Sequence, residues 1–188
     1  AGITDIRLPY PTNPVNATRV MALQDRIRIS TVVDNLEVAQ QWSSVMAGAG
    51  RRLDVLVKVD VGFHRCGINP DLPDASGILR AIAACPGLRF LGLLSHAGHG
   101  YHAESNETLE RIAACEIQIL TRLAAGLQND GVEVQEISVG ATPTARFIVA
   151  QKGVTEMRPG NYVFFDRTQV GLGSATVEQC SLGIVATV

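Results

Sequence analysis

Apolar, β-rich runs alternate with segments of helical periodicity along the whole of this 188-residue chain. The runs predict strands at 3–8, 27–33, 53–60, 90–96, 134–139 and 154–158, a further β segment at 162–165 and a terminal one at 180–188. Such alternation predicts a parallel sheet covered by helices, either an open doubly wound sheet or a β/α barrel.

Five helices are expected between the strands. One begins at Asn13-Pro14, and a second follows Asp34, with Glu37 placed as its capping-box partner. The others cover about 73–85 and about 105–129, and a short one begins at Thr142-Pro143. In the longest, apolar residues recur at spacings of three and four: Leu109, Ala113, Ile117, Leu120, Ala124 and Leu127.

The strand at 53–60 favours a barrel. One of its faces is apolar, whereas the other includes Asp54, Lys58 and Asp60. An apolar outer face under helices, with an inner face that is polar near its carboxyl end, is typical of a barrel with its site at the C-terminal mouth. Six strands fit this pattern, so we predict a partial (β/α)8 TIM-type barrel.

The two ends of the chain indicate a piece of a longer protein. The sequence opens on a β-rich run without a preceding turn, and it closes within another such run. We expect a partial barrel domain over residues 1–175, followed by the first strand of a truncated C-terminal β domain over 176–188.

Composition argues against several classes of partner. The 16 basic and 18 acidic residues nearly cancel, and aromatic residues make up only 5%, which does not indicate a nucleic-acid-binding face. No apolar run approaches the roughly 18 residues of a membrane span, and the N-terminus lacks a signal-peptide pattern, so we expect a cytoplasmic protein. The four cysteines form no C-x-x-C pair, which argues against a zinc cage or a disulfide framework.

Polar and glycine-rich residues gather after the predicted strands, where barrels and open sheets bind ligands. A first cluster runs over 58–67 and presents Arg65, which is suited to grip a carboxylate or phenolate oxygen; a surface-loop arginine is the alternative. For Lys58 the spacing favours an inward lysine paired with Asp60 or Asp54.

A second cluster, Ser95 to His102, holds three histidines at a spacing of three. Imidazole is a common metal ligand, but no carboxylate or cysteine lies beside them at ligand spacing. Packing of a histidine against a planar ligand is therefore preferred to a metal site, and ordinary loop histidines remain the alternative for His99 and His102.

A third cluster has two parts, at 138–144 and 156–162. The first is a glycine turn that leads into the short helix, with Thr142 at its cap, and free N–H groups at such a start bind anions. The second adds Gly160 at the next strand end. Together they match the way barrels hold a phosphate in the loops after their last two strands.

In this order, the motifs resemble the pyridoxal-phosphate enzymes of the alanine-racemase-type barrel, and within them the D-threonine aldolase and D-serine dehydratase-like branch. The residues that carry the likeness are VDVGFHRCG at 59–67, SHAGH at 95–99, SVGATPT at 138–144 and RPGNY at 158–162. The likeness covers essentially the whole chain. It implies an eight-stranded barrel followed by a β-rich domain, with barrel strands three to eight present here.

The resemblance also implies roles for individual residues. Arg65 would approach the cofactor's phenolic oxygen or the substrate carboxylate, His96 would stack on the pyridine ring, and Arg158 would face the pyridine nitrogen. We therefore expect Arg65, His96 and Tyr101 to be catalytic. We expect the cofactor to be bound by His96, Gly140, Thr142, Arg158, Gly160, Asn161 and Tyr162, with no metal ligand in this chain.

The implied function is that of a pyridoxal 5'-phosphate-dependent lyase acting on D-β-hydroxy amino acids, by D-serine dehydration or D-threonine retro-aldol cleavage. The lysine that attaches the cofactor would precede residue 1, and neither Lys58 nor Lys152 would take its place. The ligands of a divalent metal would lie in the C-terminal β domain, so this incomplete chain is expected to be inactive. The resemblance further implies a homodimer. The alternatives are an amino-acid racemase of the same fold or a non-catalytic cofactor-binding barrel.

Overall fold

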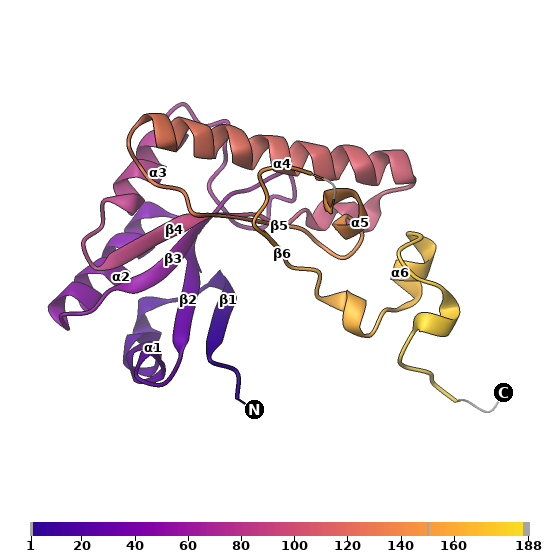
Figure 1. The fold of residues 1–188 in the computed structure, drawn as a ribbon, viewed down its shortest axis with the longest axis horizontal. Helices are drawn as coiled ribbons and strands as arrows, with labels where there is room; N and C mark the ends of the chain where they lie inside the picture. The colour runs from indigo at the N-terminus through magenta and orange to yellow at the C-terminus, as the bar shows by residue number, and fades with distance from the viewer. Residues whose placement is uncertain (1, 150, 186–188) are drawn as a thin grey trace.

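A computed structural model describes residues 2–149 and 151–185 of the chain. Within them, parallel strands form one six-stranded sheet in which spatial order follows chain order (Figure 1). The strands are β1 (Asp5–Pro11), β2 (Arg28–Val33), β3 (Leu53–Lys58), β4 (Leu88–Leu94), β5 (Glu136–Val139) and β6 (Glu156–Met157). The helices are α1 (Ala17–Gln24), α2 (Leu36–Gly48), α3 (Ala75–Ala83), α4 (Asn106–Asn129), α5 (Ala145–Ile148) and α6 (Arg167–Gly171).

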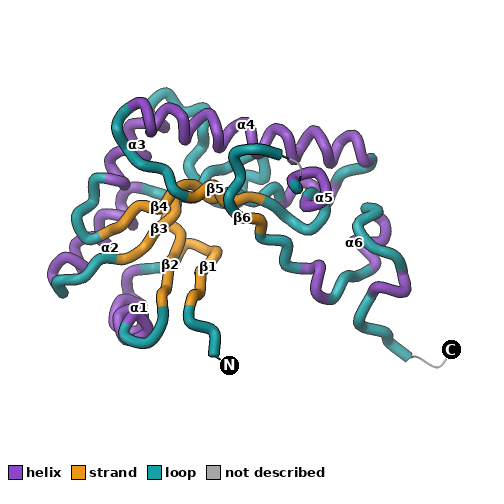
Figure 2. Tube along the Cα trace, viewed as in Figure 1, coloured by secondary structure: helices purple, strands orange, loops and turns teal. Residues whose placement is uncertain are grey.

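Consecutive parallel strands require crossover connections, and the helices provide them (Figure 2). Their apolar faces pack on one face of the sheet in a single large core, which contains Val55 and Val57 of β3 together with Trp42, Leu79 and Leu120. The opposite face carries a second, smaller cluster: Val32, Leu56, Leu91 and Leu94. The two-faced character predicted for β3 is confirmed.

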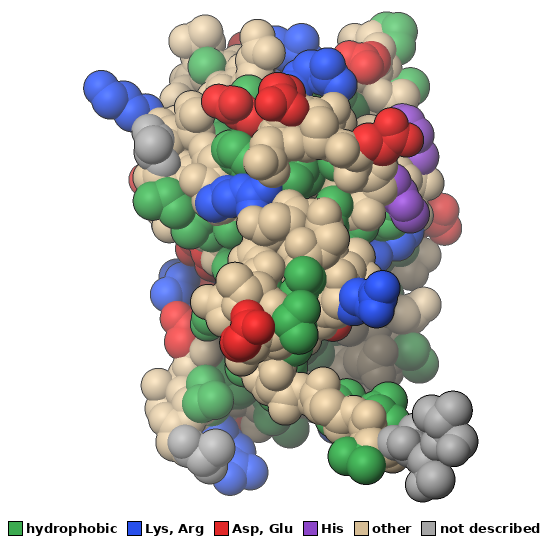
Figure 3. Space-filling view, turned by 90° about the vertical axis from the view of Figure 1, so that its right-hand side faces the viewer, with side chains coloured by type: hydrophobic (Ala, Val, Ile, Leu, Met, Phe, Trp, Pro, Cys, Tyr) green, Lys and Arg blue, Asp and Glu red, His purple; other side chains and the backbone are tan. Residues whose placement is uncertain are grey.

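Ion pairs hold the sheet in a curl. Arg7 on β1 pairs with Glu136 on β5 and with Glu156 on β6, so the first strand approaches the last two across the inner face. Because six parallel strands with intervening helices curl in this way, the sheet is a half-barrel, as the partial TIM-type barrel predicts. On the face shown in Figure 3, acidic and basic side chains are intermixed.

The long helix α4 follows its predicted pattern, since all six of the recurring apolar residues are buried. The predicted start of α2 is wrong by one residue. Asn35 is the cap, because its side chain accepts the Val38 N–H at 2.8 Å, and Glu37 lies in the first turn without closing a capping box.

The predicted β segment at 162–165 is also wrong. The N–H groups of Phe164 and Phe165 both bond to the Asn161 carbonyl, at 3.0 and 2.7 Å, and wind the chain into a 3-10 turn over Asn161–Val163. Of the predicted terminal strand, 180–185 is not strand, and 186–188 lies outside the described residues. The helix expected from Thr142-Pro143 begins later, at Ala145, after a turn in which Thr144 Oγ1 accepts the Ala141 N–H at 3.2 Å.

No helix among the described residues is both long enough and apolar enough to cross a membrane.

Candidate functional site

A cavity of about 590 Å³ opens where the carboxyl ends of the strands meet. Its lining comes from the end of β1, the end of β3 and the loops that follow β3, β4, β5 and β6. Seven of the nine predicted site residues line it: Arg65, His96, Tyr101, Thr142, Arg158, Gly160 and Asn161. Residues that are up to 96 positions apart in the sequence therefore share one cavity.

Arg65 is exposed and is oriented by aromatic rings. Its guanidinium carbon lies 5.3 Å from the centre of the Tyr10 ring and 5.2 Å from that of Phe63. The Phe63 ring in turn stands edge-on to His96, with centroids 6.1 Å apart. Phe63 thus contacts two predicted site residues, and the cation–π contacts leave the guanidinium donors free for an anion.

The loop that presents Arg65 is shaped by Asp60. Its Oδ1 accepts the N–H groups of Gly62 and His64, both at 3.0 Å, and its Oδ2 lies 2.8 Å from His64 Nδ1. Burial alone would raise the pKa of Asp60, but these bonds lower it below its usual value. A charged Asp60 therefore fixes the turn, in which His64 has a left-handed φ of 54°.

His96 is half-buried after β4, with Nδ1 3.2 Å from the Gly140 carbonyl oxygen. A carbonyl oxygen can only accept, so Nδ1 carries the proton and, in the neutral ring, Nε2 is free to accept. Burial lowers the pKa of His96, and the nearby cations of Lys58, Arg65 and Arg158 lower it further. The imidazole ring of His96 is therefore uncharged at neutral pH and presents a planar face.

The turns after β5 and β6 are joined by one hydrogen bond. Thr142 Oγ1 accepts the Asn161 N–H at 3.0 Å. Because Thr142 Oγ1 is the acceptor in this hydrogen bond, its own hydroxyl hydrogen remains available to be donated to an anion. Gly140 precedes this turn with φ of +104°, a conformation that a side chain would strain, although Gly140 itself does not line the cavity.

Arg158 is held from several sides. Its Nε donates to Ser138 Oγ at 2.7 Å, its Nη2 donates to the Ser95 carbonyl, and Glu156 Oε1 lies 3.6 Å from Nε. These contacts with β5 and β6 fix the orientation of the Arg158 guanidinium, which suits it to orient a ligand.

Lys58 differs from its prediction. It is 3% exposed at the end of β3, and among the described residues no carboxylate lies within ion-pair distance of it. Asp54 pairs with Arg89 and Arg28 instead, and Asp60 pairs with His64. Burial lowers the pKa of Lys58 to about 8, and the cations of Arg158 and Arg65 act in the same direction, against the opposing effects of Cys66 and Glu116.

The predicted site residue Tyr162 lies outside the cavity lining, and so do His99 and His102, the other two histidines of the second cluster. His99 packs beside Gly62, His102 is exposed, and Tyr162 is exposed in the 3-10 turn. Among the described residues, no three His, Cys, Asp or Glu side chains are placed to hold a metal ion.

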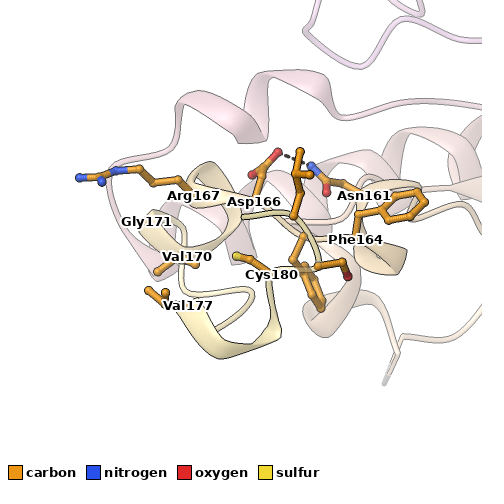
Figure 4. A pocket seen from close by; sticks show the side chains of 11 residues that line it. Asn161, Phe164, Asp166, Arg167, Val170, Gly171, Val177 and Cys180 are labelled. Atoms are coloured by element: carbon orange, nitrogen blue, oxygen red, sulfur yellow. Dashed lines mark hydrogen bonds between the residues drawn. The ribbon is translucent and has the colours of Figure 1, made fainter. Parts of the chain in front are cut away.

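A second cavity, of about 1060 Å³, lies among the residues that follow β6 (Figure 4). Its walls are mostly apolar and include Phe164, Val170 and Val177, with Asp166 bonded to Asn161 at 2.7 Å. It contains one cation, Arg167, and only Asn161 of the predicted site residues. Although it is larger, it lacks the convergent polar groups of a catalytic site, so we assign the candidate site to the smaller cavity.

Sequence reasoning missed Arg7, Pro9 and Tyr10, and it placed Glu156 in the third cluster without giving it a role. Arg7 and Glu156 are charged residues at inward positions of strands, and such placement is itself a signal, because barrel interiors are usually filled by apolar side chains. Tyr10 carries no comparable signal, since it is 60% exposed between two prolines at the end of β1.

Comparison with known proteins identifies the family to which this fold belongs. The family model for the alanine racemase N-terminal domain matches residues 7–168. The chain is 32% identical over 192 residues to D-threo-3-hydroxyaspartate dehydratase of Delftia sp. (strain HT23), covering 100% of this chain and 50% of that protein. It is 33% identical over 174 residues to D-threonine aldolase of Arthrobacter sp, covering 88% of this chain and 44% of that protein.

The solved structure of the Delftia dehydratase superposes with a TM-score of 0.89 at 30% identity, covering 96% of this chain and 48% of that one. The chain spans about half the length of these two curated relatives. Since the family model covers most of the sequence and the half-barrel carries the expected residues around one cavity, the chain belongs to the alanine racemase N-terminal domain family.

Proposed function

We propose that this chain binds pyridoxal 5'-phosphate in the cavity at the carboxyl ends of its strands, as part of a lyase that acts on D-β-hydroxy amino acids. The observation that carries the proposal is the convergence of Arg65, His96, Thr142 and Arg158 on one cavity. The names of the relatives, a dehydratase of a D-3-hydroxy amino acid and a D-threonine aldolase, support the substrate class.

The residues present fit this cofactor. The volume of about 590 Å³ lies within the range of small-molecule sites. Thr142 offers a free hydroxyl proton beside the two turns, which suits a phosphate, and His96 offers a neutral ring for a planar partner. Lys58 and Arg65 lack carboxylate partners among the described residues, so an anionic ligand would supply the missing countercharge.

Bound pyridoxal phosphate supplies an electron sink for negative charge at the α-carbon of an amino acid. The residues of this chain would orient the cofactor and the substrate and neutralise their negative charges. Arg158 would hold the ring nitrogen by donation, and Arg65 would hold the phenolic oxygen or the substrate carboxylate. Lys58 Nζ, with a pKa of about 8, can exchange a proton near neutral pH.

Dehydration is the first reaction to test, because one relative that matches the whole chain is named as a dehydratase. The 95–101 stretch also resembles the D-serine dehydratase-like group. Retro-aldol cleavage and racemisation are the alternative outcomes. The proposal includes a divalent metal and a homodimer for the full-length protein.

Cofactor binding is tested on the 188-residue chain by equilibrium dialysis against pyridoxal 5'-phosphate. We expect saturable binding at one site, at least tenfold weaker in His96→Leu and unchanged in His102→Leu, which alters an exposed histidine of the adjacent turn. Absence of saturable binding in the parent chain would refute the assignment of the cavity.

Substrate class is tested on the chain together with the flanking residues that its coding DNA specifies. With D-serine, D-threonine and D-threo-3-hydroxyaspartate, ammonia release reports dehydration and glycine release reports retro-aldol cleavage. Inversion at the α-carbon without either product, detected by chiral chromatography, reports racemisation of D-serine or epimerisation of the other two substrates. Turnover of none of the three substrates would count against the lyase.

A further inference from the structure

A buried acid lies behind the candidate site without lining it. Glu116, on the sheet-facing side of α4, is 1% exposed. Its Oε1 accepts the Ser95 hydroxyl at 2.6 Å and the Gly140 N–H at 3.2 Å. One oxygen thus bonds the residue that follows β4 and the residue that follows β5.

These two bonds act on residues of the candidate site. Ser95 directly precedes His96, and Gly140 accepts from His96 Nδ1 through its carbonyl oxygen at 3.2 Å. Gly140 is therefore held on both sides, by Glu116 at its N–H and by His96 at its C=O. Thr142 follows two residues later, so the same clamp fixes the start of the turn that we assign to the phosphate.

Burying the carboxyl group of Glu116 costs free energy, which argues that this residue does more than fill the core. A carboxyl group on the buried face of a helix is expensive to desolvate, and Oε2 has no hydrogen-bond partner. Burial raises the pKa of Glu116, with Arg158 acting in the opposite direction. An apolar residue there would avoid that cost, but it would leave Ser95 Oγ and Gly140 N–H without partners.

We propose that Glu116 is a positioning residue that ties the carboxyl ends of β4 and β5 together through a single acceptor oxygen, and so sets the tautomer of His96 and the course of the Gly140–Thr142 turn. The part that concerns cofactor affinity rests on the proposed function. The part that concerns His96 does not.

The test compares variants at position 116 in the cofactor-free chain. Glu116→Gln keeps an acceptor oxygen on a side chain of equal length, whereas Glu116→Met keeps the length and removes the acceptor. Glu116→Asp keeps the carboxyl group but withdraws it by one methylene, and it serves if the Met variant does not fold. Glu110→Gln and Glu110→Met, at an exposed position of the same helix, are the matched controls.

The first readout is the ¹⁵N spectrum of the histidine rings, with His96 assigned through His96→Leu. We expect the Nδ1–H tautomer in the parent chain, in Glu116→Gln and in both controls. In Glu116→Met and Glu116→Asp the Gly140 carbonyl is no longer held, so the Nε2–H form should appear. Overall packing does not select a ring tautomer, so this readout separates positioning from mere stability.

The second readout is the dissociation constant of pyridoxal 5'-phosphate, which should rise at least fivefold in Glu116→Met and Glu116→Asp and stay within twofold in Glu116→Gln. The proposal is overturned if the Met and Asp variants keep the parent tautomer, or if Glu116→Gln loses it as they do. If the parent chain does not bind the cofactor, the proposed function fails, while the tautomer still decides the role of Glu116.

Discussion

Lys58 gives the sharpest prediction, because its amine is buried and, among the described residues, no carboxylate lies within ion-pair distance of it. The pKa of the folded state is about 8, against 10.5 for an ordinary lysine. Between these two pH values the unfolded chain binds one more proton than the folded chain, so stability rises with pH across this window. Below pH 8 the penalty is fully present, and above pH 10.5 it is absent.

The size of the penalty follows from the two pKa values. At about 1.36 kcal/mol per pH unit, the difference corresponds to about 3 kcal/mol for a fully enclosed amine. The cavity is open to water, which screens the charge, so we expect about 2 kcal/mol. Lys58→Met keeps the apolar stem and removes the charge, and it should therefore stabilise the chain by about 2 kcal/mol at pH 7 and by little at pH 10.5.

Urea denaturation of parent and variant at several pH values measures this difference. Lys152→Met is the matched control, because Lys152 is the only other lysine and is exposed. Reductive methylation with ¹³C-formaldehyde then gives a separate NMR titration curve for each of the two lysines. A Lys58 titration near pH 10.5, or a destabilised Lys58→Met at pH 7, would show that the amine is solvated or paired and would refute the reasoning.

Three further outcomes are expected. Gly98→Ala places a methyl group 2.6 Å from the Phe63 ring, so it should weaken cofactor binding severalfold and lower the free energy of unfolding by about 1 kcal/mol. Gly126→Ala has open space around it and should leave cofactor binding unchanged. Equilibrium dialysis measures the binding, and urea denaturation measures the stability. Borohydride reduction with pyridoxal phosphate followed by mass analysis should show no specific adduct on Lys58 or Lys152, and such an adduct would contradict the implied position of the cofactor lysine. Because β1 and β6 each have a single strand partner among the described residues, light scattering should show association as concentration rises; a monomer throughout would contradict that expectation.

The sequence predicts those elements whose pattern is long or two-sided. Helix α4 repeats its apolar spacing over 24 residues, so a single tertiary contact cannot override it. The alternation in β3 likewise separates a helix-covered face from an inner face. In contrast, the short apolar run at 162–165 predicts a strand, but the segment forms a turn because the Asn161 carbonyl accepts two N–H groups.

The predicted pairing of Lys58 is wrong because the sequence pattern shows which face of a strand a residue lies on, whereas pairing also depends on distance along the strand. Asp54 and Lys58 share a face of β3, yet four residues at about 3.3 Å each place them roughly 13 Å apart, at opposite ends of the strand. Glu116 could have been found, because it lies on the buried stripe of α4 between Ala113 and Leu120, where an acidic residue is out of place. Its hydrogen-bond partners, Ser95 and Gly140, are set by tertiary structure that no local pattern contains.

The ion pair between Arg7 and Glu156 joins residues 149 positions apart, whereas each strand pairs with its immediate neighbour in the chain. Closing so long a loop costs more entropy than forming each βα unit, whose contacts are local. The strands and helices can therefore assemble one unit after another as the chain grows, before the sheet curls. Since Arg7 and Glu156 both line the candidate cavity, the cavity takes its described form only after the last of these steps, and a ligand that binds there would report the end of folding.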